Sequence, residues 1–286
     1  MRILITGSAG FIGFHLVKKY LKNKNNIVVG IDSLNDYYSV NLKKKRLSIL
    51  SSNSKFKFYK INLLEKKKLE KIIKEFNPEI IFHLAGQPGV LYSFKNPSSY
   101  KKNNTEATMI ICKICKKYNI KNFIFGSSSS VYGDQKTFPI KENFKKNPKN
   151  FYALTKFKCE KIVKKFFKNT KTNYKIFRFF TVYGPLGRPD MFIHKFLNSL
   201  KYNKKIKLHN SGKNYRDFTY VGDVVRILFS QHKIKDNSKI FNICRSKPIK
   251  TINLISLIKK KYNIKEFNKI NLTGFIRGEM LKTHGS

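Results

Sequence analysis

The chain has 286 residues, 41% of them hydrophobic, a length that suits one large domain or two unequal ones. Its 60 lysines and arginines against 16 aspartates and glutamates give a formal net charge of +44. Lysines interrupt every apolar run before it reaches the length of a membrane span, so we expect no transmembrane segment. Because the first predicted strand starts at Arg2, we expect no signal peptide and a cytoplasmic location.

The strong positive charge has two interpretations. A basic surface binds nucleic acid by releasing counterions from the phosphates. Here, however, the lysines are scattered over every predicted helix, and they accompany many Asn, Ile, Phe and Tyr residues, whose codons are also rich in A and T. We therefore favour compositional drift over nucleic-acid binding, and expect the charge to attract anionic ligands in general.

Strand-like and helix-like segments alternate along the first part of the chain. Apolar runs predict strands at 2–6, 26–31, 56–61, 79–85, 122–127 and 174–180, and amphipathic segments predict helices at 11–23, 65–76, 98–118 and 151–168. Continuous apolar strands that alternate with helices are typical of a parallel sheet buried on both faces. The pattern predicts a doubly wound α/β fold of the Rossmann type over residues 1–180.

The rhythm changes after Phe180. Gly184-Pro185, Gly187 and Pro189 break the alternation, and short strands mix with helical segments beyond them. We expect residues 181–286 to form a smaller second lobe.

The cysteines do not predict a metal or redox site. Cys112 and Cys115 form a CxxC pair, which can bind metal or undergo redox chemistry. Their segment has helical character, however, and the spacing puts both thiols on its apolar face. Since neither Cys159 nor Cys244 belongs to a second pair, we interpret these cysteines as structural and expect no metal.

A glycine-rich turn between the first strand and the first helix predicts a dinucleotide site. The first glycine of "ILITGSAGFIGFHLV" allows a tight turn, the second lets the backbone approach a pyrophosphate, and the third allows close helix packing. The helix start supplies N–H donors for phosphates. Asp32 ends the next strand, where its carboxylate can accept both ribose hydroxyls and would repel a 2′-phosphate, which favours NAD over NADP. The residues predicted at the turn are Gly7, Gly10, Phe11, Ile12 and Gly13.

A tyrosine and a lysine form the predicted catalytic pair. Tyr152 and Lys156 are four residues apart and share a helix face. A tyrosine titrates near pH ~10, but a cation about 5 Å away contributes on the order of 3 kcal/mol at an effective dielectric of ~20. This equals roughly two pKa units, so Tyr152 can serve as a base near neutrality.

The serine run 127–130 follows the fifth strand, at the sheet edge where ligands bind.

The GxxGxxG turn together with the Tyr–Lys pair resembles the extended short-chain dehydrogenase/reductase superfamily, and within it the NAD-dependent epimerase/dehydratase family. The resemblance implies an adenine contact at Asn62, where the family usually has Asp, followed by Leu63. It also implies that Leu84 and Ala85 line the cofactor. We interpret His83, which ends the fourth strand, as structural.

The stretch "GSSSSVYG" carries two further implications of the resemblance. Aligned on "VYG", Ser128 is the hydroxyl of the family's Ser–Tyr–Lys triad, with Ser127 and Ser129 as alternatives. Family members that are 4,6-dehydratases carry an acidic pair at the positions of Ser129 and Ser130. Without an acid to protonate the leaving hydroxyl, elimination is disfavoured and epimerisation is favoured.

Four stretches, 30–47, 126–133, 178–191 and 216–225, resemble the subfamily of UDP-glucuronate 4-epimerases. The implied reaction oxidises C4 of the sugar to a ketone and returns the hydride to the opposite face, with NAD kept in the site. The ketone would be a β-keto acid, and a clamp on the carboxylate would prevent loss of CO2. The implied roles are sugar contacts at Ser128 and Ser129, carboxylate contacts at Thr181 and Arg188, a diphosphate contact at Arg216 and a ribose contact at Glu279.

Three alternatives stay open: an epimerase of the UDP-galactose type, a UDP-glucuronate decarboxylase, and a catalytically silent basic Rossmann protein that binds nucleic acid. The family resemblance implies a homodimer built through segments 98–118 and 151–168. Because family members continue beyond the position of Ser286, we expect the 181–286 lobe, which would bind the substrate, to be C-terminally incomplete.

Overall fold

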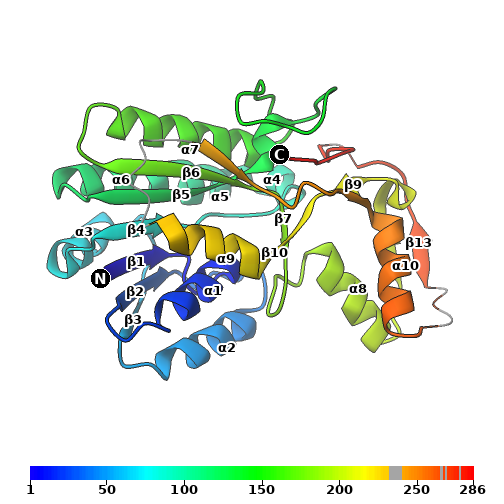
Figure 1. The fold of residues 1–286 in the computed structure, drawn as a ribbon, viewed down its shortest axis with the longest axis horizontal. Helices are drawn as coiled ribbons and strands as arrows, with labels where there is room; N and C mark the ends of the chain where they lie inside the picture. Colours follow the sequence, from blue (N-terminus) through cyan, green and yellow to red (C-terminus); the bar gives the residue numbers. More distant parts are fainter. Residues whose placement is uncertain (232–239, 265–266, 268, 277) are drawn as a thin grey trace.

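The computed structural model describes residues 1–231, 240–264, 267, 269–276 and 278–286 (Figure 1). A parallel sheet with the order β11-β6-β5-β4-β1-β2-β3 forms its centre. The strands are β1 (Arg2–Thr6), β2 (Ile27–Asp32), β3 (Phe56–Lys60), β4 (Ile80–His83), β5 (Asn122–Ser128), β6 (Asn173–Phe179) and β11 (Ile240–Ile243). The strand order reverses between β1 and β4, which confirms the predicted doubly wound fold.

Helices cover both faces of this sheet. One face packs on α1 (Phe11–Tyr20), α2 (Val40–Ser51) and α9 (Val221–Ser230), and the other on α3 (Lys66–Phe76), α6 (Ala107–Lys117) and α7 (Phe151–Phe167). Side chains of each strand alternate between the two cores: Leu4 faces the second set of helices, and Ile3 and Ile5 face the first. This alternation explains why the inner strands β1 and β4 carry uninterrupted apolar runs.

The helices differ from the prediction at two places. The helix expected over 98–118 is divided into α5 (Pro97–Tyr100), a π-helical segment η1 (Lys101–Glu106) and α6, and a short α4 (Tyr92–Lys95) precedes it. The sequence did not single out α2, because its apolar positions are few. Its inward face instead buries the charged side chains of Lys43 and Arg46.

The central sheet continues past residue 180. Strand β11 pairs with β6, and α9 packs against α1, although both lie in the segment expected to form the second lobe. The division at residue 180 stays a prediction, but the sheet layer does not end there. The other elements of this segment are β7 (Thr181–Tyr183), α8 (Phe192–Lys201), β8 (Ile206–Leu208), η3 (His209–Gly212), β9 (Tyr215–Arg216), β10 (Phe218–Tyr220), β12 (Ile249–Lys250), α10 (Thr251–Lys261) and β13 (Ile270–Leu272).

A small core separate from the sheet holds the far part of this segment together. Phe196 of α8, Ile206 and Leu208 of β8, and Ile255 of α10 are buried against one another. Figure 1 shows these elements on the right, away from the sheet, with the C-terminal residues returning toward the sheet. The molecule therefore has a sheet body and a smaller lobe, joined on the side where β7 and β9 lie.

Cys112 and Cys115 are buried in the core beside the sheet, as predicted from their helix face. Burial raises the pKa of both thiols. Over the described ranges, none of the helices combines the length and the apolar character needed to cross a bilayer.

Candidate active site

A cleft runs along the carboxyl ends of the parallel strands. Each strand from β1 to β6 contributes its last residue or the loop after it, so sequence segments far apart meet at one sheet edge. The predicted residues that line the cleft are Gly7, Gly10, Phe11, Ile12, Gly13, Asp32, Asn62, Leu63, Leu84, Ala85, Ser128, Tyr152, Lys156 and Arg188.

The glycine turn after β1 is closely packed. Gly7 has φ +73°, and a Cβ at this position would lie 2.8 Å from the backbone nitrogen of Ala85. A Cβ on Gly13 would collide with the carbonyl oxygen of Gly7, so the turn requires glycine there as well as at its start. Gly10 begins α1 without a side-chain cap, which leaves the first N–H groups of the helix directed at the cleft without a competing side-chain acceptor.

Asp32 joins the end of β2 to this turn. Its carboxylate accepts hydrogen bonds from the backbone N–H of Ala9 at 3.2 Å and of Leu34 at 2.9 Å. Burial raises the pKa of Asp32, while these two N–H groups and the nearby cations Lys43 and Arg46 oppose the increase. The carboxylate lines the cleft at the end of β2, and its contact with a ribose stays a prediction.

Lys43 and Arg46 of α2 are site residues that the sequence did not single out. Lys43 lines the cleft and donates from Nζ to the backbone oxygen of Asn35 at 2.6 Å. Arg46 is fully buried and donates to the Ala9 oxygen at 2.8 Å and, from Nη2, to the Leu186 oxygen at 2.7 Å. It thus ties the glycine turn to the loop before Arg188. Their only sequence signal is the stretch 30–47, which carries part of the family resemblance.

The predicted adenine end of the cleft is formed by the loop after β3. Asn62 lines the cleft, and its side-chain oxygen already accepts the N–H of Leu64 at 3.0 Å. Because an amide oxygen has two lone pairs, it can still accept a second donor. Leu63 is buried beside it.

Helix α7 presents the predicted catalytic pair to the cleft. Tyr152 lies in its first turn, with its ring edge against Tyr100 at 6.1 Å between centroids. Lys156 lies one turn later, is 7% exposed, and donates from Nζ to the backbone oxygen of Gly126 at 2.7 Å. The ammonium group is therefore held against the end of β5, on the same helix face as Tyr152.

The serine run separates into distinct environments. Ser128 lines the cleft. The Oγ of Ser128 accepts hydrogen bonds from the backbone N–H of Ser130 at 3.2 Å and from the Ser130 hydroxyl at 2.9 Å. Ser127 also borders the cleft, but its hydroxyl donates to Glu160 at 2.6 Å. Ser129 begins the short helix η2 (Ser129–Tyr132) and is buried outside the set that lines the cleft. Ser128 thus lines the cleft, the Ser127 hydroxyl is engaged by Glu160, and the role of Ser128 in the triad stays a prediction.

A buried ion pair lies directly beneath this serine run. Arg178 of β6 donates from Nε and Nη2 to the two carboxylate oxygens of Glu160 on α7, at 2.8 and 2.7 Å. Both side chains are almost fully buried, and Arg178 also donates to the hydroxyl of Tyr132 at 2.8 Å. No sequence pattern indicated this pair, which connects α7, β5 and β6.

His83 is buried and does not line the cleft, in agreement with a structural role. Its Nδ1 bonds to the hydroxyl of Thr6 on β1 at 2.9 Å, and its Nε2 bonds to the hydroxyl of Thr108 on α6 at 3.0 Å. Thr108 in turn donates to the Cys159 Sγ on α7 at 3.4 Å. Burial, with a smaller effect of the charge of Lys156, lowers the pKa of His83 to about 3.

Arg188 borders both the main cleft and a smaller adjoining pocket, which Thr181 also lines. The Arg188 guanidinium donates from Nε and Nη2 to the carboxylate of Asp190 at 3.0 and 2.5 Å, and Tyr37 donates to the same carboxylate at 3.2 Å. Burial alone would lower the pKa of Arg188, but the bonds and charge of Asp190 raise it. Tyr152 is close enough to contribute to the same electrostatic balance.

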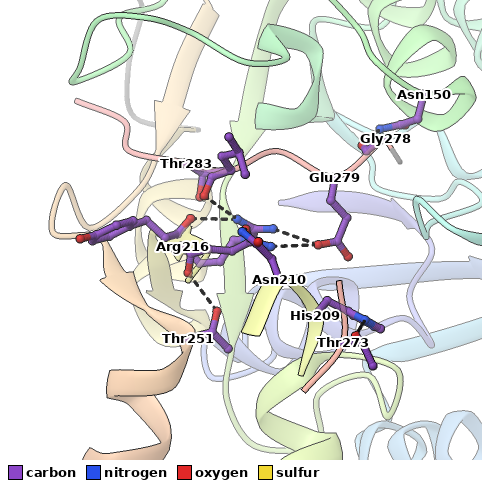
Figure 2. Close-up of polar contacts among 12 residues, drawn as sticks. Asn150, His209, Asn210, Arg216, Thr251, Thr273, Gly278, Glu279 and Thr283 are labelled. Carbon is purple, nitrogen blue, oxygen red and sulfur yellow. Dashed lines mark hydrogen bonds and ion pairs between the residues drawn. The ribbon is translucent and has the colours of Figure 1, made fainter. Parts of the chain in front are cut away.

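Arg216 and Glu279, predicted separately at the nucleotide, lie together outside the main cleft (Figure 2). Arg216 Nη2 is 3.4 Å from Glu279 Oε2, which also accepts a hydrogen bond from the amide of Asn214 at 3.2 Å. Glu279 lines a separate open pocket together with Lys149. Burial lowers the pKa of Arg216, against the effect of Glu279.

Residues 3–244 match the model of the NAD dependent epimerase/dehydratase family. The chain belongs to this family. It is 37% identical over 224 residues to a UDP-glucuronate 4-epimerase of Thermodesulfobacterium geofontis, covering 78% of this chain and 69% of that protein. An uncharacterized protein of Methanocaldococcus jannaschii is 38% identical over 284 residues, or 99% of this chain and 86% of the relative.

Among solved structures, this family member is similar to UDP-glucuronic acid 4-epimerase from Bacillus cereus in complex with UDP-glucuronic acid and NAD. The two share 32% sequence identity with a TM-score of 0.94, over all of this chain and 90% of the other. The chain is thus an enzyme of an NAD-dependent family.

The residues present fit this cofactor. The two glycines of the turn leave room that a Cβ would fill, the uncapped helix start offers N–H donors, and Asp32 ends β2 inside the cleft.

Proposed function

We propose that this epimerase-family enzyme interconverts UDP-glucuronate and UDP-galacturonate. The observation that carries the proposal is the position of Arg188, a partly buried cation at the edge of the cleft that Tyr152, Lys156 and Ser128 line. A cation there suits a substrate that carries a carboxylate. The similarity to the Bacillus cereus enzyme, whose structure contains UDP-glucuronic acid and NAD, supports the same substrate.

In this proposal Tyr152 accepts the proton of the C4 hydroxyl and later returns it. Lys156, held by its bond to Gly126, lies one turn after Tyr152 on the same helix face and lines the same cleft. Ser128 is positioned at the cleft to hydrogen-bond the same oxygen of the sugar. When NAD is bound, it supplies the hydride acceptor and donor that oxidation and reduction at C4 require.

The carboxylate clamp is the second part of the proposal. Asp190 accepts hydrogen bonds from Nε and Nη2 of Arg188, which leaves the Nη1 group and the second N–H of Nη2 as further donors. Arg188 can therefore bind the sugar carboxylate while Asp190 holds the guanidinium in place. Thr181, which lines the pocket shared with Arg188, is the proposed second contact. A carboxylate held out of line with the C4 ketone π-system would not leave as CO2.

The nucleotide half of the substrate is proposed to bind at Arg216 and Glu279, with the diphosphate at Arg216 and a ribose hydroxyl at Glu279. The pair is separated by 3.4 Å, so a diphosphate can approach Arg216 without breaking a short ion pair. Ser129 stays a predicted sugar contact, although its present position is behind the cleft surface.

The test is incubation of the purified protein with UDP-glucuronate and NAD, with the sugar products identified by chromatography and released CO2 measured. We expect UDP-galacturonate at an equilibrium ratio and no CO2. Release of CO2 with a UDP-pentose would assign decarboxylation instead, and turnover of UDP-galactose alone would assign the neutral-sugar type.

The homodimer through segments 98–118 and 151–168 and the cytoplasmic location also remain part of the proposal. Analytical ultracentrifugation at several protein concentrations tests the first, and we expect the mass of two chains.

A further inference from the structure

Asn150 makes two hydrogen bonds that connect separate parts of the molecule. Its Oδ1 caps α7 by accepting the backbone N–H of Ala153 at 2.8 Å, and Ala153 directly follows Tyr152, which lines the cleft. Its Nδ2 donates to the backbone oxygen of Gly278 at 3.0 Å. The side chain is 8% exposed, and its two partners determine which end of the amide is oxygen.

The Gly278 side of this contact belongs to a segment that we call the C-terminal strap, residues 278–286. Glu279, the next residue of the strap, pairs with Arg216, as Figure 2 shows with Asn150 and Gly278 close by. The strap then pairs with β9: Tyr215 N–H donates to the Leu281 oxygen at 2.9 Å, and Thr283 N–H donates to the Tyr215 oxygen at 3.1 Å. The strap therefore joins Arg216 to the start of α7.

Gly278 is the point at which the strap meets α4 and α7. It has φ +86°, and a Cβ there would lie 2.7 Å from the ring of Phe94 on α4. Because Gly278 directly precedes Glu279 in the chain, a displacement of Glu279 would act on the carbonyl that Asn150 binds.

Helix capping alone does not account for asparagine at this position. Serine, aspartate and asparagine cap helices about equally well, because each supplies an acceptor oxygen. Only asparagine also offers an N–H₂ donor from the same short side chain. The donor, and with it the strap contact, is what distinguishes Asn150 from a simple cap.

We propose that Asn150 is a positioning residue, which couples occupation of the Arg216–Glu279 nucleotide site to the placement of the first turn of α7 and hence of Tyr152. The inference rests on the proposed function, since it takes the diphosphate of a nucleotide sugar as the ligand of Arg216. A diphosphate would share the guanidinium with Glu279, and the resulting shift of Glu279 would reach α7 through Gly278 and Asn150.

The experiment measures hydrogen–deuterium exchange across residues 147–160 of the full chain loaded with NAD, with and without saturating UDP. In the wild type we expect UDP to slow exchange in the first turn of α7 by about threefold or more. Asn150→Ser and Asn150→Asp both keep a capping oxygen and remove the N–H₂ group that donates to Gly278. The carboxylate of aspartate has no donor, and serine has one shorter-reaching oxygen in place of the two amide atoms. We expect both variants to bind UDP by calorimetry, but to show no such slowing.

Turnover gives a second measurement with the same variants. We expect kcat to fall by about tenfold, as for a small misplacement of a reacting group, with little change in the Kd for UDP. If UDP slows exchange in the variants as much as in the wild type, or fails to do so in the wild type while binding, the coupling is wrong and the proposed function stands. If the wild type binds no UDP, the proposed function fails and the coupling fails with it.

Discussion

Tyr152 and Lys156 differ in how the surrounding chain holds them. Lys156 is buried and bonded to the carbonyl of Gly126, whereas Tyr152 lies at the cleft surface with its ring against Tyr100. The cation is thus held by β5, while the tyrosine depends on the start of α7 for its position. A base that must approach substrate and then release it benefits from this arrangement.

The first prediction concerns the hydroxyl of Tyr152. We expect Tyr152→Phe to lower kcat by about 10²- to 10⁴-fold, the usual contribution of a general acid–base group. The amount of NAD that the purified protein retains, measured by absorbance, should not change. Tyr118→Phe is the control, because the Tyr118 hydroxyl bonds Glu70 away from the cleft. Equal rates for Tyr152→Phe and the wild type would contradict the assignment of the base.

The second prediction concerns the carboxylate clamp. Replacing Arg188 alone would leave Asp190 partly buried without its cation, so the informative variant is Arg188→Gln combined with Asp190→Asn. Loss of a charged hydrogen bond of about 1.5–3 kcal/mol should reduce the preference for UDP-glucuronate over UDP-glucose by about 10- to 150-fold. Competition binding measures this preference from the Kd values of UDP-glucuronate, UDP-glucose and UDP. Equal losses for all three ligands would mean that Arg188 does not recognise the carboxylate.

At the scale of elements, α7 is the one that organises the site. Tyr152, Lys156 and Glu160 occur at successive turns of one helix face, and the latter two bond to consecutive residues of β5, Gly126 and Ser127. Helix and strand are therefore held in one relative position at two adjacent points. This determines where Ser128, the next residue of β5, lies relative to the catalytic pair.

The third prediction follows from the buried pair beneath that strand. Glu160→Gln leaves the guanidinium of Arg178, with side-chain exposure of 1%, without a counter-charge. We expect a loss of about 3–5 kcal/mol in the free energy of unfolding, measured by urea denaturation. Adding Arg178→Met to Glu160→Gln should restore part of the loss, since the stranded charge is removed. No recovery in the double variant would mean that packing, rather than charge, is responsible.

How much the sequence predicts depends on whether the signal is local. The apolar runs predict six of the seven strands of the sheet, and the glycine turn and Tyr152–Lys156 follow from short spacings. Strand β11 was not predicted, because it lies beyond residue 180, where the regular alternation of strands and helices is broken. Helix α2 was missed because Lys43 and Arg46 occupy inward positions where apolar residues are expected. The break of segment 98–118 at η1 leaves the apolar pattern intact, so periodicity does not reveal it.

Contacts between distant charged residues were not predictable. Glu160 and Arg178 lie on different elements, and in a chain with a net charge of +44 an arginine carries little information by itself. Arg216 and Glu279 were each implied by family resemblance, but their pairing through the strap depends on how the lobe folds back. The position of Ser129 behind the cleft likewise follows from the short helix η2, which four serines in a row do not predict.

At the scale of the whole molecule, the buried His83 makes the stability of the fold depend on pH, and its hydrogen bonds join the sheet to the helices on one of its faces. Through Thr6, Thr108 and Cys159 it connects β1, β4, α6 and α7, and it remains neutral because its pKa is held at about 3. In an unfolded chain a histidine titrates near ~6.5. Between these values the unfolded chain binds a proton that the folded chain does not, so stability is full above pH ~6.5 and falls as the pH decreases.

The fourth prediction quantifies this effect. We expect the free energy of unfolding to decrease by up to about 1.4 kcal/mol per pH unit below pH ~6 owing to this group alone. Urea denaturation of the wild type and of His83→Asn, which cannot titrate there, measures the difference between pH 7 and pH 5. The variant should show a smaller dependence on pH, and parallel curves would exclude His83 as the source.

The pairing of β11 with β6 also has a consequence for how the protein is made. A nascent chain that ends shortly after β6 presents that strand with an open edge, and the face of α1 that α9 later covers is exposed. Unpaired strand edges and uncovered apolar faces are where growing chains associate wrongly. The sheet of each new molecule therefore remains incomplete until residues 240–243 have left the ribosome, and until then its open edge can pair with other chains.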